Sequence, residues 1–453
     1  MVVRGVRFGT RFSRIRTGGT IGHYLPSTVV SVTRYTHGDA VHIRHPNPYV
    51  GTLPLRTMDF SEPSEATQIK KALDDFIEAE VEPLENEHPE FLGEDYQRHI
   101  VDDDHYQVPE YRDIVETVRK KSVEAGFYGM DMPEEAGGGG VDLLTAAIVT
   151  EHLSNRPPGF HSAIMGGAGG PTPILLACTE EQREEYLEPL MDGEITTCFA
   201  LTEPDHGSDP HYMDATAEKD GDEWVINGEK YWITNGPYAD FAMVFARTSG
   251  EKGDYGGITC FLVDDHQYEV EKVHRTMGLT PGGQAQLRFD DVRVGEDKVL
   301  GEVDDGFGTA MSWIGGGRIK IAASAVGTAQ HLLDMAVEYA RDRETFGKPI
   351  GHRQGVSFQI ADLATEIEQV RWLYRYAAWK IQNDDRARKE ESMAKLRGAE
   401  LANEAADVAM QVYGGAGFMK DTPIEREYRS ARVLRIFEGT DEIQRRTIAR
   451  ELI

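Results

Sequence analysis

The stretch with the clearest capacity for chemistry is RIFEGTDEIQRR, residues 435–446. It places the carboxylate of Glu438 between an aromatic residue and Gly439, and further acids and arginines follow at once. A carboxylate in a site that excludes water can act as a general base, because loss of water raises its pKa. The chain holds 77 acids, however, so residue type alone also fits a solvated surface carboxylate.

The composition indicates a large, acidic, globular protein. The 453 residues are 40% hydrophobic and carry a net charge of −29, from 77 acids against 48 lysines and arginines. This charge repels phosphate backbones, so we expect no nucleic-acid partner. Its scatter along the chain is typical of salt-adapted cytoplasmic proteins. Three widely spaced cysteines favour a reducing compartment, and no apolar run is long enough for a membrane span.

The first 57 residues differ from the rest. They hold eight arginines, no lysine and one acid, a net charge of +7, so the remainder of the −29 chain carries −36. Three interpretations compete: a mitochondrial transit peptide, a small extra domain, and an extension outside the fold. We favour the extension, with the fold beginning at Met58, and a cytoplasmic location over the mitochondrial matrix.

The elements that must position Glu438 form three parts. Helical periodicity predicts an α-helical domain over 58–195. Alternating β-branched and aromatic residues predict an antiparallel β domain over 196–300, in which Asn227-Gly228 favours a two-residue hairpin turn. Helical periodicity returns over 301–453, with long helices near 308–342, 354–382 and 390–413. The glycine-rich loop 134–140 follows no strand, so we reject it as a phosphate cradle.

Five short motifs carry a resemblance to a known family. They are CFALTEPDHGSDP (198–210), KYWITNG (230–236), RDRETFGKPI (341–350), QVYGGAGF (411–418) and RIFEGTDEIQR (435–445). In this order and spacing they resemble the acyl-CoA dehydrogenase family over residues 60–453. The resemblance implies a mixed α and β fold: an N-terminal α-helical domain, a middle antiparallel β domain and a C-terminal four-helix-bundle domain.

The same resemblance implies FAD as the cofactor and no metal. A second copy of the chain would complete the FAD site, which makes the protein at least a dimer and by family habit a homotetramer. The implied FAD contacts are Phe199, Leu201, Thr202, Ser208, Trp232, Ile233, Thr234, Arg343, Phe346, Gln354, Gln411, Gly414, Gly415, Thr440 and Glu442. Several of these residues also have an explanation that needs no FAD. Ser208 fits a turn, Ile233 fits strand packing, and Gly414-Gly415 fits the end of a helix.

By resemblance, Glu438 removes the α-proton of an acyl-CoA thioester while the β-hydride passes to flavin N5. Gly439 would leave room for the substrate, and Ser208 and Arg318 would contact it. Some family members carry the base immediately before the arginine that Arg318 resembles, but here that residue is Gly317. Glycines at 315–317, where the family more often has polar or acidic residues, and His206, where alanine is usual, depart from the pattern.

We therefore predict an acyl-CoA dehydrogenase of fatty acid β-oxidation that passes electrons to an electron-transferring flavoprotein. An acyl-CoA oxidase that uses oxygen and a flavin monooxygenase on the same fold remain open alternatives, although monooxygenases generally do not use the glutamate base. A non-catalytic binding protein is a third alternative, which the negative charge disfavours. The residues do not predict the length or branching of the acyl chain.

Overall fold

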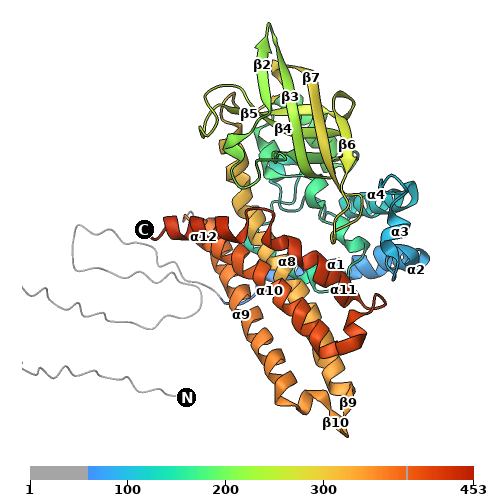
Figure 1. The fold of residues 1–453 in the computed structure, drawn as a ribbon. Helices are drawn as coiled ribbons and strands as arrows, with labels where there is room; N and C mark the ends of the chain where they lie inside the picture. Colours follow the sequence, from blue (N-terminus) through green and yellow to red (C-terminus); the bar gives the residue numbers. More distant parts are fainter. Residues whose placement is uncertain (1–59, 384–385) are drawn as a thin grey trace, which may run out of the picture. The chain divides into compact units, whose positions relative to one another are not determined.

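The computed structural model describes residues 60–383 and 386–453, apart from the side chains of 311–314. Residues 62–453 form one compact unit (Figure 1). The predicted extension over 1–57 and the predicted start at Met58 lie outside the described residues.

The N-terminal part of this unit is helical, as predicted. Its amphipathic helices bury one apolar stripe in a shared core that includes Leu73, Ile100, Val118 and Phe160. The helices are α1 (Ser64–Phe76), α2 (Glu82–Glu87), α3 (Tyr96–Ile100), α4 (Pro109–Glu124), α5 (Leu143–Ser154), α6 (Glu180–Gln182) and α7 (Glu188–Met191).

The middle part is a sheet of eight strands in the order β6-β7-β3-β2-β4-β5-β8, with β1 paired to β4. Its pairs are mostly antiparallel, whereas β1 runs parallel to β4. The strands are β1 (Thr197–Ala200), β2 (Thr216–Asp220), β3 (Glu223–Thr234), β4 (Phe241–Arg247), β5 (Ile258–Asp264), β6 (Glu269–Val273), β7 (Gln284–Gly295) and β8 (Val299–Leu300).

The predicted hairpin turn at Asn227-Gly228 is wrong. Both residues lie inside β3, where the register against β7 shifts between Ile226 and Gly228. Gly228 has φ +147°, and a Cβ there would stand 2.6 Å from the Cβ of Ala215. Glycine therefore serves a bulge and a close approach at this point, rather than a turn.

The C-terminal part is built on three long helices that lie side by side (Figure 1). They are α8 (Gly306–Asp342), α9 (Gln354–Gln382) and α10 (Arg388–Tyr413), within two residues of the predicted bounds. Small and branched apolar residues from all three fill one core. The short hairpin of β9 (Glu344–Thr345) and β10 (Lys348–Pro349) joins α8 to α9, and α11 (Pro423–Ala431) and α12 (Asp441–Arg450) follow α10.

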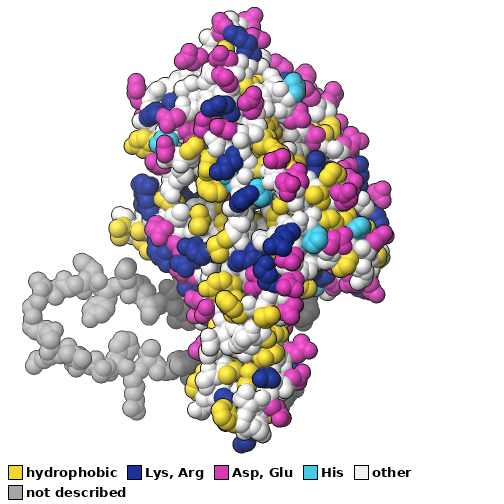
Figure 2. Space-filling view, turned by 45° about the vertical axis from the view of Figure 1, so that its right-hand side comes forward, with side chains coloured by type: hydrophobic (Ala, Val, Ile, Leu, Met, Phe, Trp, Pro, Cys, Tyr) yellow, Lys and Arg dark blue, Asp and Glu magenta, His cyan; other side chains and the backbone are white. Residues whose placement is uncertain are grey.

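Charged side chains of both signs spread over the visible face of the sheet domain, and apolar side chains are more frequent around the long helices (Figure 2). In the described part of the chain, no helix is long and apolar enough to cross a membrane. Within the same residues, no group of histidines, cysteines and acids could hold a metal ion.

Candidate active site

Glu438 lies in the short loop that leads into α12. Its φ is +53° and that of Gly439 is +88°, so two successive residues adopt the left-handed conformation. This conformation is strained for glutamate and persists only where surrounding groups hold it. The Thr440 hydroxyl accepts a hydrogen bond from the Ile443 amide and caps α12.

Three side chains from separate segments hold the backbone of this loop. Gln444 Nε2 donates to the carbonyl oxygens of Glu438, at 2.8 Å, and Gly439, at 3.1 Å. Lys395 Nζ, on α10, donates to the Gly439 oxygen at 2.7 Å. Arg318 Nε, on α8, lies 3.5 Å from the Glu438 oxygen. The loop is thus fixed by α8, α10 and α12 together.

Burial raises the pKa of the half-buried Glu438 carboxyl, and the charges of Arg318 and Lys395 lower it again. Burial also lowers the pKa of Lys395, to about 8, although Asp441 and Glu438 oppose this shift. A carboxyl whose pKa is raised by burial and lowered by two nearby cations has the setting of a general base.

The predicted flavin-facing wall comes from the segment after β1 and the end of β3. Lys230 is fully buried, and its Nζ donates to the Leu201 oxygen at 3.2 Å and to Glu203 Oε1 at 2.8 Å. Glu203 also accepts hydrogen bonds from the amides of Asp214 and Ala215. The Tyr231 amide donates to the Thr202 oxygen at 2.8 Å. Hydrogen bonds therefore hold Thr202 and both of its neighbours, Leu201 and Glu203.

The groups exposed on this wall fit a flavin. Within the described residues, the hydroxyls of Thr202, Thr234 and Ser208 make no hydrogen bond, which leaves them available to a polar ring edge. Trp232 is 55% exposed on left-handed backbone, with φ +62°. Large exposed aromatics in strained conformations are typical of ligand sites. FAD bound here would be held by these side chains and the adjacent backbone.

The other residues predicted to contact the flavin ring range from buried to exposed. Phe199 packs on Phe245 with ring centroids 4.8 Å apart, and Leu201 is buried. The Ile233 side chain lies in the sheet core, as strand packing alone requires. Glu442 is exposed at the start of α12.

The remaining predicted FAD contacts gather at the far end of the long helices. Arg343, Phe346 and Gln354 lie around the β9-β10 hairpin, and Gln411, Gly414 and Gly415 lie where α10 ends. Stacking of Tyr339 on Tyr413, with centroids 4.1 Å apart, joins the two helix ends. All six residues are exposed, and Phe346 is 96% exposed with φ +51°.

This far cluster is separated from Glu438 by most of α8, which has 37 residues and a length of about 55 Å. Figure 1 shows the hairpin at the end of the helices opposite the sheet. One chain therefore does not bring the two halves of the predicted FAD site together. Gly414 also ends α10, so its ordinary role as a helix stop is satisfied.

Of the two departures from the family pattern, His206 has an ordinary explanation. Its ring lies 3.7 Å from Asp209 and 3.5 Å from Asp214, and stacks on Tyr212. The glycines at 315–317 have a different consequence: the Glu391 carboxylate of α10 lies directly over Gly315.

Sequence reasoning missed the residues that position the site. The sequence motifs assign no role to four of them: Lys395, Gln444, Lys230 and Glu203. Lys230 gave one usable signal, because strand alternation places it on the buried face of β3. Lys395 gave none, since its partner Gly439 is distant in sequence. The partners of Gln444 and Glu203 are nearer, but they lie in irregular segments that no periodic pattern reveals.

Comparisons with known proteins show the family of this chain. Three models of acyl-CoA dehydrogenase domains match the chain: the N-terminal domain over 63–194, the middle domain over 198–292 and the C-terminal domain over 304–453. The chain belongs to the acyl-CoA dehydrogenase family. It is thus an oxidoreductase that acts on a CH–CH bond, and FAD is its cofactor, as the motifs predicted.

Two relatives and one solved structure illustrate the similarity. The 3-(aryl)acrylate reductase of Clostridium sporogenes is 38% identical over 400 residues, 87% of this chain and 100% of the relative. Subunit CarC of the caffeyl-CoA reductase-Etf complex of Acetobacterium woodii is 38% identical, covering 77% of this chain and 92% of the subunit. The structure of butyryl-CoA dehydrogenase from Megasphaera elsdenii superposes with a TM-score of 0.74 at 32% identity, covering 87% of this chain and 100% of that one.

Proposed function

We propose that this protein dehydrogenates an acyl-CoA thioester to the trans-2-enoyl-CoA, with Glu438 as the base that removes the α-proton. The observation that carries the proposal is the fixed position of Glu438, half-buried on left-handed backbone between Arg318 and Lys395. FAD, when bound, supplies the two-electron acceptor for the β-hydride.

The chain's own residues account for the proton. Burial makes the Glu438 carboxylate basic, and an acyl chain that closes the site would remove more water and raise its pKa further. Gly439 presents no side chain next to the base, and its backbone is held by Lys395 and Gln444. The fixed loop orients the carboxylate for an α-proton on one face of the substrate.

An electron-transferring flavoprotein is the proposed electron acceptor. One relative is named as a subunit of a reductase-Etf complex. Oxygen is the acceptor in the oxidase alternative. Arylpropionyl and short linear acyl-CoAs are the substrates to test first, because the relatives are an arylacrylate reductase and a butyryl-CoA dehydrogenase.

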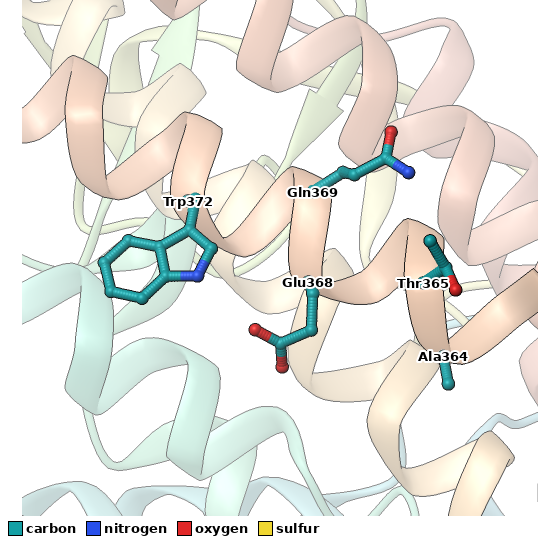
Figure 3. Close-up of a pocket in the computed structure, with 5 residues that line it drawn as sticks. All are labelled: Ala364, Thr365, Glu368, Gln369 and Trp372. Carbon is teal, nitrogen blue, oxygen red and sulfur yellow. The ribbon is translucent and has the colours of Figure 1, made fainter.

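We further propose that the protein is a homo-oligomer, by family habit a tetramer, in which a second copy completes each FAD site. The separation of the two groups of predicted FAD contacts along α8 supports this. Two further features of α9 agree with an interface: the exposed aromatic side chain of Phe358 and a shallow hollow of about 600 Å³. Ala364, Thr365, Glu368, Gln369 and Trp372 line this hollow (Figure 3).

The test is anaerobic mixing of the holoenzyme with linear, branched and arylpropionyl-CoA thioesters. We expect at least one class to bleach the flavin and yield the enoyl-CoA. Reoxidation is then followed separately with an electron-transferring flavoprotein and with oxygen. Fast reoxidation by oxygen alone would favour the oxidase, and an absence of bleaching with every thioester would contradict the proposed dehydrogenation.

A further inference from the structure

A second carboxylate stands close to the base. Glu391 lies on α10, and a Cβ on Gly315 of α8 would be 2.9 Å from its Oε2 and 3.1 Å from its Oε1. The carboxylate therefore occupies the space that a side chain at 315 would need. The family resemblance predicts a polar or acidic residue in this part of α8, and here the acid comes from the facing helix.

Arg318 connects Glu391 with the base. Gly315 and Arg318 are three residues apart and share one face of α8. The Arg318 guanidinium lowers the pKa of both Glu391 and Glu438, against the effect of burial, which raises them. One cation is thus shared between two half-buried carboxylates.

The facing helix continues the pattern. Glu391 and Lys395 are four residues apart on α10 and share a face, and Lys395 binds the Gly439 oxygen. Charges of opposite sign therefore alternate in the order Glu391 on α10, Arg318 on α8, Glu438 in the loop before α12, and Lys395 on α10. The other charged groups that act on these four are Arg388 and Glu390 beside Glu391, and Asp441 beside Lys395.

The neighbouring Glu390 provides a comparison. Its carboxylate lies 3.1 Å from Lys380 Nζ and 3.3 Å from Lys389 Nζ, so its charge is neutralised locally. The Glu391 carboxylate makes no hydrogen bond or close ion pair within the described part of the chain. The nearby charges that offset it are those of Arg318 and Arg388.

We infer that Glu391 is a positioning residue for the proposed reaction. Its negative charge offsets part of the positive charge of Arg318, and Glu438 therefore stays basic enough to take the α-proton. The inference rests on the proposed function of Glu438. Without Glu391, the full charge of Arg318 would stabilise the Glu438 carboxylate. The Glu438 pKa would then be lower and the base weaker. A residue that merely fills the space over Gly315 would not have this effect.

The first test uses Glu391→Gln, which keeps the shape and removes the charge, with Glu390→Gln as the matched control. Infrared difference titration of each holoenzyme, from about pH 5 to about pH 9, gives the midpoint of the carboxyl band that Glu438→Gln abolishes. We expect Glu391→Gln to lower this midpoint by about 0.5–1 pH unit and Glu390→Gln to leave it in place. An unchanged or raised midpoint in Glu391→Gln would overturn the inference.

The second test moves the carboxylate to the other helix. Glu391→Ala should likewise lower the pH midpoint of the acid limb of flavin reduction by acyl-CoA. Glu391→Ala/Gly315→Asp returns an acid three residues before Arg318 and should restore the wild-type pH midpoint of the acid limb. Failure to restore it in a folded, FAD-loaded double variant would contradict the role of the charge. If no thioester reduces the wild-type flavin, the proposed function fails, and the infrared midpoint still decides the role of Glu391.

Discussion

At the scale of single residues, the site depends on charges balanced around one strained backbone segment. Glu438 and Gly439 adopt left-handed conformations that Lys395 and Gln444 hold by hydrogen bonds to their carbonyl oxygens. Lys395 is buried, so its ammonium acts on Glu438 with little screening by water. Cations on two helices, Arg318 on α8 and Lys395 on α10, therefore lower the pKa of the proposed base.

Lys395→Met should shift the acid limb in the direction opposite to Glu391→Gln. Loss of the ammonium removes a charge that lowers the Glu438 pKa, so the acid limb of flavin reduction should rise by about 0.5–1 pH unit. Stopped-flow reduction across pH measures it, with the exposed Lys71→Met as control. A limb that moves to lower pH would show that Lys395 does not act through its charge.

At the scale of elements, a buried ion pair joins β3 to the segment that carries Thr202. Lys230 is fully buried and bonds to the Leu201 oxygen and to Glu203. Breaking such a pair leaves a buried carboxylate without its partner.

Lys230→Met should destabilise the protein by about 3–5 kcal/mol and reduce its FAD content, because Glu203 is left charged and the Thr202 segment loses its anchor. Calorimetry and the ratio of flavin to protein absorbance measure the two effects. Lys230→Met/Glu203→Gln should recover part of both. A single variant with full stability and full FAD would exclude this anchoring role.

The short helix α11 carries a separate pH-dependent element. Glu427 is 9% exposed, and burial raises its pKa to about 7, although Arg426 opposes the shift. A carboxyl whose folded pKa exceeds its unfolded value near 4.5 favours folding at low pH. That contribution is full below about pH 4.5 and is lost as the pH rises through about 7.

Glu427→Gln should therefore stabilise the protein at about pH 8, by up to roughly 2 kcal/mol, and give little change near pH 4.5. Thermal unfolding at the two pH values measures the difference. Glu78→Gln, at an exposed position on the N-terminal side, is the control. Equal melting temperatures for Glu427→Gln and wild type at the higher pH would contradict the assigned shift.

At the scale of the whole molecule, the length of α8 separates two groups of residues that the family resemblance places around one FAD. Arg343 is exposed at the far end of α8, beside the β9-β10 hairpin. A guanidinium there suits a pyrophosphate presented by another copy of the chain.

Arg343→Ala should lower FAD content and weaken the oligomer, because the pyrophosphate would lose its cation at the interface. Light scattering and flavin absorbance test this together, and Arg341→Ala, an exposed neighbour, is the control. A monomeric variant with full FAD occupancy would contradict a shared site.

The sequence predicted the long helices and the β domain well because their periodic patterns are strong over many residues. It failed at Asn227-Gly228, since a glycine that a bulge requires looks the same as one that a turn requires. It predicts Glu438 as the base only through a family motif. Lys395 and Glu391 could not be predicted, because their contacts with Gly439 and Gly315 join segments far apart in the chain. Gln444 contacts a loop only a few residues away, but the left-handed bend that brings the two together follows no periodic pattern.

The most direct test of the central claim is Glu438→Gln, which keeps the shape of the side chain and removes the base. The holoenzyme is mixed with a reducing acyl-CoA, and exchange of the α-hydrogen in D2O is followed by mass spectrometry beside flavin bleaching. We predict that the variant retains FAD and binds the thioester but loses α-exchange and flavin reduction by about 10²–10⁴-fold. Exchange and reduction at wild-type rates would show that Glu438 is not the base.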